Sequence, residues 1–227
     1  MAYYKEVILM WLLSFFVFTI QALNPVLFFD DFDDKALPGW RISNNVGVFA
    51  DRGTLFMGRD ADILTRDPGS EDWTNYTVIF RFRITEMDEL SQFIIDIRSH
   101  PGLFNVITSQ SVNIFPKNIA VWTIRPKLDR DERPIDRGVI KQPLELKKRY
   151  ILVIDTLNNN FAIYLDDQKL LSYEDPETPP GYVRLSLGPF GATRVELDYF
   201  SVIQGGYFID SQGKLTTTWG WSKQISK

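Results

Sequence analysis

The sequence contains no cysteine and only one histidine, His100, among its 227 residues. Without cysteine the chain can form neither a disulfide bond nor a thiolate metal site. With one histidine it cannot build a multi-histidine metal centre, and any imidazole-dependent dyad or triad would rest on His100 alone. These absences exclude the common thiol and polyhistidine chemistries, and we interpret His100 as an exposed loop residue.

The chain also lacks an excess of positive charge. Its 25 basic residues are outnumbered by 29 acidic ones, which gives a net charge of -4, and the basic residues are scattered along the sequence. Nucleic-acid binding proteins usually gather lysine and arginine into a patch or stripe. The composition therefore predicts no nucleic-acid partner, while 44% hydrophobic and 14% aromatic residues are enough for a packed core.

A long apolar stretch occurs once, at residues 7–20, just after Lys5. It is short for a membrane span, which needs about 20 residues, and it fits the apolar region of a secretory signal. Ala22 is an acceptable residue at a cleavage point, and Pro25 follows soon after. We predict a signal peptide over residues 1–22 and a secreted or cell-envelope location. An uncleaved membrane anchor is the alternative, and it is the only membrane contact that we expect.

Helical periodicity is missing after residue 25, and alternation of apolar and polar residues takes its place. Val78, Phe80, Phe82 and Ile84 fall on one face of a predicted strand. Similar alternation marks several further segments: 92–98, 119–125, 150–155, 160–165, 182–187 and 194–203. Many short strands separated by turn residues predict an all-β protein, a two-sheet antiparallel jelly-roll sandwich. We place this domain at residues 23–204, followed by a linker and short C-terminal tail at 205–227.

Both ends of the predicted sandwich carry recognisable strings. The first reads Asp-Asp-Phe-Asp-Asp at 30–34, followed by Gly39-Trp40 and by Asp-Arg-Gly-Thr-Leu at 51–55, and the last strand is 194–203. Together they resemble the concanavalin A-like lectin/glucanase superfamily, which includes LamG-like domains and 3-keto-disaccharide hydrolase-like domains. The resemblance implies a jelly roll that is often a sugar-binding platform.

Two enzymatic branches of that superfamily can be compared with the sequence. Family-sixteen glucanases carry E-x-D-x-x-E on the catalytic strand, and the nearest string here, Glu86 to Ser91, ends in serine and is interpreted as a solvated turn. The 3-keto-disaccharide hydrolase-like domain tends to show Phe-Arg-Ile, an Asn-Ser-Gly turn and a strand that ends in arginine. Residues 82–84 and Arg98 match that pattern, but Leu-Ser-Gln at 90–92 replaces the turn.

The resemblance also implies a possible structural calcium ion. In glucanase-like relatives such an ion joins an aspartate of the last strand to backbone carbonyls of the first strand and of a Gly-x-Leu turn. The matching positions in this sequence are Asp198, Asp30 or Asp31, and Gly53. Hard oxygen ligands of this kind suit Ca²⁺. The alternative interpretation is that these aspartates are ordinary turn and edge residues.

The outward positions of the predicted strands give a candidate ligand-binding face. Trp122 and Tyr164 offer flat surfaces for stacking on a sugar ring, and charged residues offer hydrogen bonds to hydroxyl groups. If the strands lie side by side, one face holds these residues: Arg81, Arg83, Asp96, Arg98, Trp122, Tyr164 and Arg184. The alternative is a solvated face crossed by Arg–Asp pairs.

Three functions follow from these observations. We favour an exported, non-catalytic carbohydrate-binding module whose partner is a glycan or polysaccharide. The first alternative is a glycoside-cleaving enzyme of the 3-keto-disaccharide hydrolase type that uses Asp96 and a loop carboxylate such as Asp88 or Glu89. The second alternative is a surface adhesion or assembly module.

Overall fold

A computed structural model describes residues 25–44, 47–67, 69–101, 107–124 and 135–205. The predicted signal peptide 1–22, most of the charged stretch 125–137 and nearly all of the tail 205–227 lie outside these residues. Within the described ranges, no helix is long and apolar enough to span a membrane.

Fifteen strands and one short 3₁₀ helix make up the described part of the chain. Their bounds are β1 (Val26–Asp30), β2 (Trp40–Asn44), β3 (Val48–Ala50), β4 (Leu55–Met57), β5 (Asp62–Thr65), η1 (Ser70–Asp72), β6 (Tyr76–Met87), β7 (Phe93–Pro101), β8 (Ile107–Ile114), β9 (Ile119–Ile124), β10 (Ile135–Ile140), β11 (Arg149–Asp155), β12 (Asn160–Leu165), β13 (Gln168–Glu174), β14 (Tyr182–Leu187) and β15 (Thr193–Gln204).

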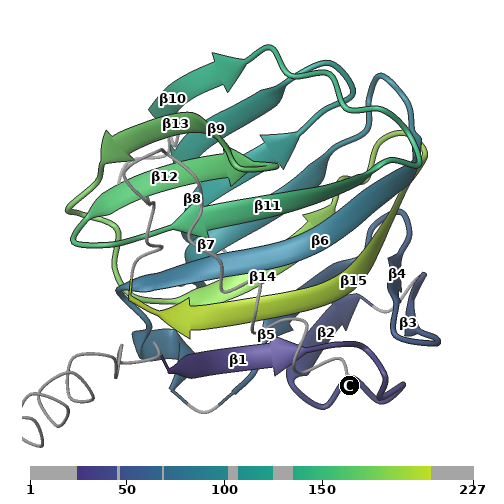
Figure 1. Cartoon of the computed structure of the whole chain (residues 1–227), viewed down its shortest axis with the longest axis horizontal. Helices are drawn as coiled ribbons and strands as arrows, with labels where there is room; N and C mark the ends of the chain where they lie inside the picture. The colour runs from purple at the N-terminus through teal and green to yellow at the C-terminus, as the bar shows by residue number, and fades with distance from the viewer. Residues whose placement is uncertain (1–24, 45–46, 68, 102–106, 125–134, 206–227) are drawn as a thin grey trace, which may run out of the picture.

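The strands form two antiparallel sheets that stack face to face (Figure 1). Sheet A has the order β13-β12-β11-β6-β15-β4-β3, with β1 also paired to β15. Sheet B has the order β10-β9-β8-β7-β14-β5-β2. This arrangement confirms the predicted all-β jelly-roll sandwich, and it places β7 in the middle of sheet B.

The core lies between the two sheets and is rich in aromatic rings. Trp40 packs against Phe28 and Phe200, with ring centroids 5.1 and 5.0 Å apart. Phe80 bridges the layers, since it contacts Phe200 of sheet A at 5.7 Å and Phe93 of sheet B at 6.2 Å. Such edge and offset contacts add to the gain from burying large apolar surfaces. This aromatic core holds the two sheets together and so fixes the positions of their outer faces.

Strand β6 shows how the sequence produces a half-buried strand. Its alternating residues Val78, Phe80, Phe82 and Ile84 are all buried, as the alternation predicted. The residues between them, such as Arg81, point to the outer face and are partly exposed. A period of two on a twisted strand places one set of side chains in the core and the other set on the surface.

Consecutive strands often belong to different sheets. Strand β6 lies in sheet A, whereas β7, which follows it after a short turn, lies in sheet B. The outward residues of β6 and β7 therefore sit on opposite sides of the molecule. This alternation between layers decides which of the predicted site residues can meet.

Candidate functional site

The structure does not bring the seven predicted ligand-binding residues onto one face. Arg81, Arg83 and Tyr164 lie on the outer side of sheet A, because β6 and β12 belong to that sheet. Asp96, Trp122 and Arg184 belong to β7, β9 and β14 and lie on the outer side of sheet B. The expectation of a single shared face is therefore wrong in its geometry, and two separate outer faces replace it.

Arg98 belongs to neither outer face. The β7–β8 register shifts between Ile97 and His100, and Arg98 itself has φ 51°, so its side chain leaves the alternation. The buried guanidinium donates hydrogen bonds to the carbonyl oxygens of Thr74, at 2.7 Å, and of Thr178, at 3.3 Å. Burial lowers the pKa of Arg98 from its ordinary value. Arg98 thus ties loops to the end of the sandwich.

Tyr164 is also unsuited to stacking on a ligand, because only 5% of its surface is exposed. It packs with Val153 and Ala162 in a small apolar cluster on the outer side of sheet A. Trp122, in contrast, is half-buried and keeps part of its ring accessible. Of the two aromatic residues predicted to stack on a sugar, only Trp122 is placed to do so.

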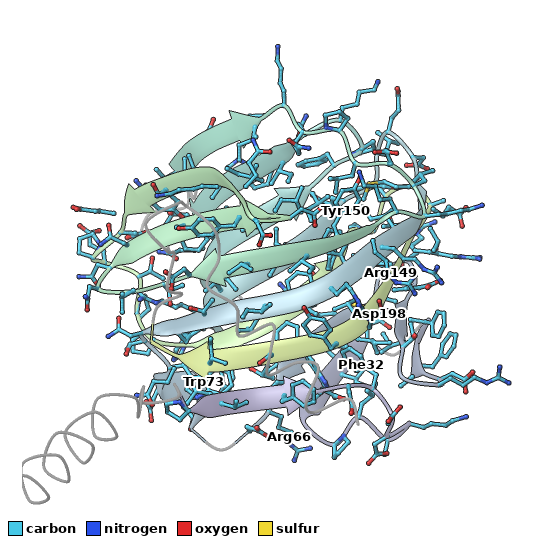
Figure 2. All side chains as sticks on the ribbon, viewed as in Figure 1. Phe32, Arg66, Trp73, Arg149, Tyr150 and Asp198 are labelled. Atoms are coloured by element: carbon cyan, nitrogen blue, oxygen red, sulfur yellow. The ribbon has the colours of Figure 1, made fainter. Side chains whose placement is uncertain are left out.

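The arginines on sheet A are paired with carboxylates. Asp198 accepts hydrogen bonds from the Nε atoms of Arg81, at 2.7 Å, and Arg149, at 2.8 Å, and Figure 2 shows Arg149 and Asp198 side by side on this face. Arg83 pairs with Glu196 in the same way. These pairs match the alternative interpretation of a solvated face with cross-strand ion pairs.

The predicted calcium ligands come together only in part. Gly53 lies close to Asp31, since an added Cβ on the glycine would be 3.5 Å from the Asp31 carbonyl oxygen. Asp30 instead accepts hydrogen bonds from Trp40 Nε1 at 2.7 Å and from the Phe32 amide at 2.7 Å. Burial is the main reason that the pKa of Asp30 is raised.

Asp198 does not fit the calcium role, because two guanidinium groups already surround its Oδ2 atom. A divalent cation there would face two positive charges at short range. Within the described ranges, no three acidic or histidine side chains cluster closely enough to hold a metal. Asp198 is therefore not free to act as the predicted ligand, and calcium binding at the four positions stays a prediction to be tested.

The outer side of sheet B carries a continuous row of neighbouring residues across its strands. Each residue in the row is the register partner of the next: Asp136, Trp122, Ser111, Asp96, Arg184, Leu64 and Arg41. Directly paired residues in antiparallel strands share a face. Asp96 stands at the centre of this row, on the middle strand of the sheet.

Asp96 is 2% exposed and is held by polar neighbours on both sides. Arg184 Nη1 donates to its Oδ2 atom at 3.2 Å, and the Ser109 hydroxyl lies 3.2 Å from Oδ1. Burial raises the pKa of Asp96, and this effect outweighs the opposing influence of Arg184, Ser111 and Ser109. An aspartate in this environment favours the protonated form more than an aspartate in water does.

Arg184 also holds a second carboxylate that the sequence analysis did not identify. Its Nε and Nη2 atoms donate to the two oxygens of Asp62, at 2.7 and 3.0 Å. Asp62 begins β5, and it is more exposed than Asp96. One planar guanidinium therefore sits between two carboxylates that differ in burial. No sequence signal pointed to Asp62, because only the strand order brings β5 next to β14.

Small polar side chains line β8 beside Asp96. Ser109, Ser111 and Asn113 alternate along the strand on its outer side, and each is at most 2% exposed. Asn113 Nδ2 donates to the Ser111 hydroxyl at 2.9 Å. These short side chains keep their hydrogen-bonding groups close to the backbone of the sheet, between the longer side chains of Trp122 and Arg184. The polar sequence of β8 gave no clear strand signal, so this stripe was missed.

An aromatic hollow adjoins the stripe. Trp122 meets Phe115 edge-on with 6.2 Å between ring centroids. The hollow has a volume of ≈ 450 Å³, and it is also lined by Glu89 and Lys117, whose charged groups are 3.0 Å apart. Flat rings beside hydrogen-bonding groups are the usual elements of a sugar subsite.

The two loop carboxylates of the enzymatic alternative, Asp88 and Glu89, lie in different surroundings. Asp88 caps its own turn, because its oxygens accept hydrogen bonds from the amides of Leu90, at 3.0 Å, and Ala192, at 2.8 Å. The Ala192 amide is the main reason that the pKa of Asp88 is lowered. Glu89 is exposed and lines the aromatic hollow. Asp88 is thus occupied, whereas Glu89 faces the same hollow as Trp122.

If Asp96 on β7 is aligned with the central aspartate of the glucanase motif E-x-D-x-x-E, the two glutamate positions of the motif can be read from the sequence. The position two residues before Asp96 is Ile94, and the position three residues after it is Ser99. Neither side chain can act as a carboxylate nucleophile or acid. Hydrolysis on this face would therefore need another carboxylate to act with Asp96.

Comparison with solved structures identifies the fold. A laminarinase from Rhodothermus marinus matches with a TM-score of 0.59 and 15% identity, over 80% of this chain and 98% of that chain. The catalytic domain of an endo-1,3-beta-glucanase from Thermotoga petrophila matches at 0.60 and 12%, over 81% and 99%. The chain has the concanavalin A-like jelly-roll fold. No protein-family model matches the sequence, and no curated protein matches it.

This concanavalin A-like jelly roll also matches a Zobellia galactanivorans protein solved with laminaritriose and laminaritetraose, at a TM-score of 0.60 and 15% identity over 81% of this chain and all of that chain. Several of the matching structures are named as glucanases or laminarinases. These matches contradict the favoured prediction of a non-catalytic module and favour the enzymatic alternative.

Proposed function

We propose that the chain is a glycoside hydrolase whose active site lies on the outer side of sheet B. The observation that carries this proposal is the pair of carboxylates, Asp96 and Asp62, held by the single guanidinium of Arg184. Glycoside hydrolysis generally requires two carboxyl groups on either side of the scissile bond, about 5 to 9.5 Å apart. The contacts of Arg184 bring both carboxyl groups to one guanidinium and so place them close to each other.

The two carboxyl groups suit different roles. The raised pKa of Asp96 favours the protonated form, which suits the general acid that protonates the leaving oxygen. Because Asp96 is 2% exposed, this role requires that substrate binding uncover its carboxyl group. Asp62 is more exposed and supplies the carboxylate that stabilises the developing positive charge or activates a water molecule. Arg184 positions both groups. Different environments for two neighbouring carboxyl groups are the recurring way in which glycosidases assign acid and base.

The substrate we propose is a polysaccharide that lies across sheet B. Trp122 and Phe115 offer an apolar platform on the same sheet as the carboxylates, and the exposed Glu89 and Lys117 at its rim offer hydrogen bonds to sugar hydroxyl groups. Structural neighbours with the same fold include a protein in complex with laminaritriose and laminaritetraose. That likeness supports a glucan as the first substrate to test. Export by a signal at residues 1–22 belongs to this proposal, because an enzyme that cleaves extracellular polysaccharides must leave the cell.

The test is release of reducing ends from laminarin, lichenan and mucin O-glycans by the mature chain. We expect activity on at least one of these substrates. Asp96→Asn and Asp62→Asn should each lower kcat by at least about 100-fold, since each removes a group used in proton transfer or charge stabilisation. Asp198→Asn, which alters a carboxylate on the opposite sheet, is the matched control and should leave kcat unchanged.

Absence of activity on all three substrates, in protein shown to be folded by its far-ultraviolet spectrum and melting temperature, would overturn the proposal. Activity that survives Asp96→Asn would remove the assigned acid. The export part has its own test, which is N-terminal sequencing of the protein recovered from the growth medium or envelope. A mature N-terminus at residue 23 is expected, and retention of residues 1–22 would contradict cleavage.

A further inference from the structure

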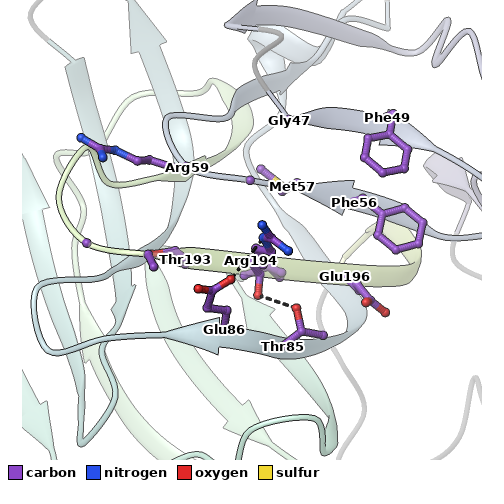
Figure 3. A pocket seen from close by; sticks show the side chains of 14 residues that line it. Gly47, Phe49, Phe56, Met57, Arg59, Thr85, Glu86, Thr193, Arg194 and Glu196 are labelled. Atoms are coloured by element: carbon purple, nitrogen blue, oxygen red, sulfur yellow. Dashed lines mark hydrogen bonds and ion pairs between the residues drawn. The ribbon is translucent and has the colours of Figure 1, made fainter.

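A second hollow lies on sheet A, whereas Asp96 belongs to sheet B. It is bordered by β3, β4, the start of β15 and the end of β6, and it has a volume of ≈ 780 Å³ (Figure 3). We call it the sheet A hollow and define it by its side-chain lining: Phe49, Phe56, Arg59, Thr85, Glu86, Thr193, Arg194 and Glu196. Its size falls in the range of small-molecule sites.

One wall of the sheet A hollow is an aromatic platform. Phe49 and Phe56 are direct register partners on β3 and β4, and their rings stack with centroids 4.8 Å apart and an interplanar angle of 12°. Phe49 is 54% exposed, which is unusual for a phenylalanine in a folded sheet. Figure 3 shows the two rings together at one end of the hollow. A flat apolar surface of this kind can pack against the C–H face of a sugar ring.

The opposite wall is polar, and its charges balance. Arg194 Nε lies 3.2 Å from Glu86 Oε2, and the Thr85 hydroxyl donates to the Arg194 carbonyl oxygen at 3.4 Å. Two acidic side chains, Glu86 and Glu196, stand against two basic ones, Arg59 and Arg194. The lining therefore carries no net charge, which favours a neutral ligand over an anion or a cation.

We propose that the sheet A hollow is a second carbohydrate-binding site, which takes a neutral oligosaccharide. The aromatic pair stacks on one sugar ring, and the paired side chains of Glu86 and Arg194 hold its hydroxyl groups. Because β3 and β4 are in sheet A, this site is separate from the carboxylates of sheet B. It would hold a polysaccharide on one side of the domain independently of any cleavage on the other.

The test is titration of the ¹⁵N-labelled domain with laminaritetraose, cellotetraose, maltotetraose and xylotetraose at millimolar concentrations. At least one of them should cause saturable shifts of backbone amides in β3 and β4. Phe49→Ala should weaken that binding by about threefold to tenfold, the loss expected for one stacked ring. Phe29→Ala is the matched control, because Phe29 is an exposed phenylalanine of the same sheet outside the hollow, and it should change nothing.

Arg194→Leu separates binding from stability. It removes the guanidinium of the polar wall, whose ion pair with Glu86 is solvent-exposed, so the melting temperature should change little while oligosaccharide affinity should fall. The proposal is overturned if none of the four saccharides shifts β3 and β4, or if Phe49→Ala binds as the unaltered protein does. Shifts confined to β7, β8 and β9 would also overturn it, and they would leave the proposed function on sheet B intact.

Discussion

Arg184 Nη1 lies 3.2 Å from Asp96 Oδ2, and this contact joins a buried carboxylate on the central strand of sheet B to its neighbour on β14. The contact does not fully offset the burial of Asp96, whose pKa remains above its ordinary value. The consequence is a definite dependence of stability on pH.

The folded state binds the Asp96 proton more tightly than the unfolded state does, because the folded pKa is raised above 3.8. The contribution of Asp96 to the free energy of unfolding is therefore fully present below pH 3.8, the pKa in the unfolded state. It is lost as the pH rises through the higher pKa of the folded state. We expect the unfolding free energy of the unaltered protein, relative to Asp96→Asn, to fall with increasing pH in that window. Urea denaturation from about pH 3 to about pH 7 measures it, and a constant difference would contradict it.

Tyr76 should make a large contribution through its hydroxyl group. The backbone amide of Arg98 donates to this hydroxyl at 2.8 Å in a fully buried setting. Tyr76→Phe leaves that amide unpaired and should lower the unfolding free energy by about 1–3 kcal/mol. Tyr150→Phe is the control, because Tyr150 accepts from the Glu145 amide at a partly exposed place and should cost less. Equal losses in urea denaturation would contradict the argument.

Gly181 marks a close approach of two backbones. A Cβ at this position would lie 2.5 Å from the carbonyl oxygen of Ser99, on the irregular end of β7. Gly181→Ala should therefore destabilise the domain by about 1–3 kcal/mol, as overpacking usually does. Gly188→Ala meets only the flexible side chain of Gln92, so it should cost much less. A melting temperature for Gly181→Ala at or above that of Gly188→Ala would show that β7 can move away.

Calcium should have little effect on the melting temperature if Asp198 keeps its two arginine partners. We expect similar melting temperatures in a chelator and in millimolar Ca²⁺, because an ion that bound the native state would raise stability by mass action. A rise with Ca²⁺ that disappears in Asp198→Asn would restore the calcium site that the resemblance implied. Arg149→Met serves as a second variant, since it removes one of the competing positive charges.

The strand pattern could be predicted from the sequence because it depends on local alternation. Segments 160–165 and 182–187 coincide with β12 and β14, and the inward residues of β6 are buried as expected. The polar β8 and the short β3 and β4 lack a strong alternating signal, so they were not recognised. Their placement depends on pairing with distant strands, which no local pattern encodes.

The candidate site could be predicted only in part, because it depends on which sheet each strand joins and not on local alternation. Asp96, Trp122 and Arg184 were identified as outward residues, and they do share the outer side of sheet B. Arg81 and Arg83 were grouped with them on the expectation that the strands lie side by side, but the chain changes sheets between β6 and β7. Arg98 was misplaced because a positive φ and a register shift interrupt the alternation. Asp62 was missed because strand order alone brings it to Arg184.

The pairing of β1 with β15 has a further consequence for the architecture. Val26 is the register partner of Ile203, and the Gln204 amide donates to the Pro25 carbonyl oxygen at 2.9 Å, so the two ends of the sandwich emerge at the same corner. A short peptide could therefore join residue 205 to residue 25 without crossing the core. New termini could then be opened in an exposed turn such as 157–159, which would give a circular permutant with both faces unchanged.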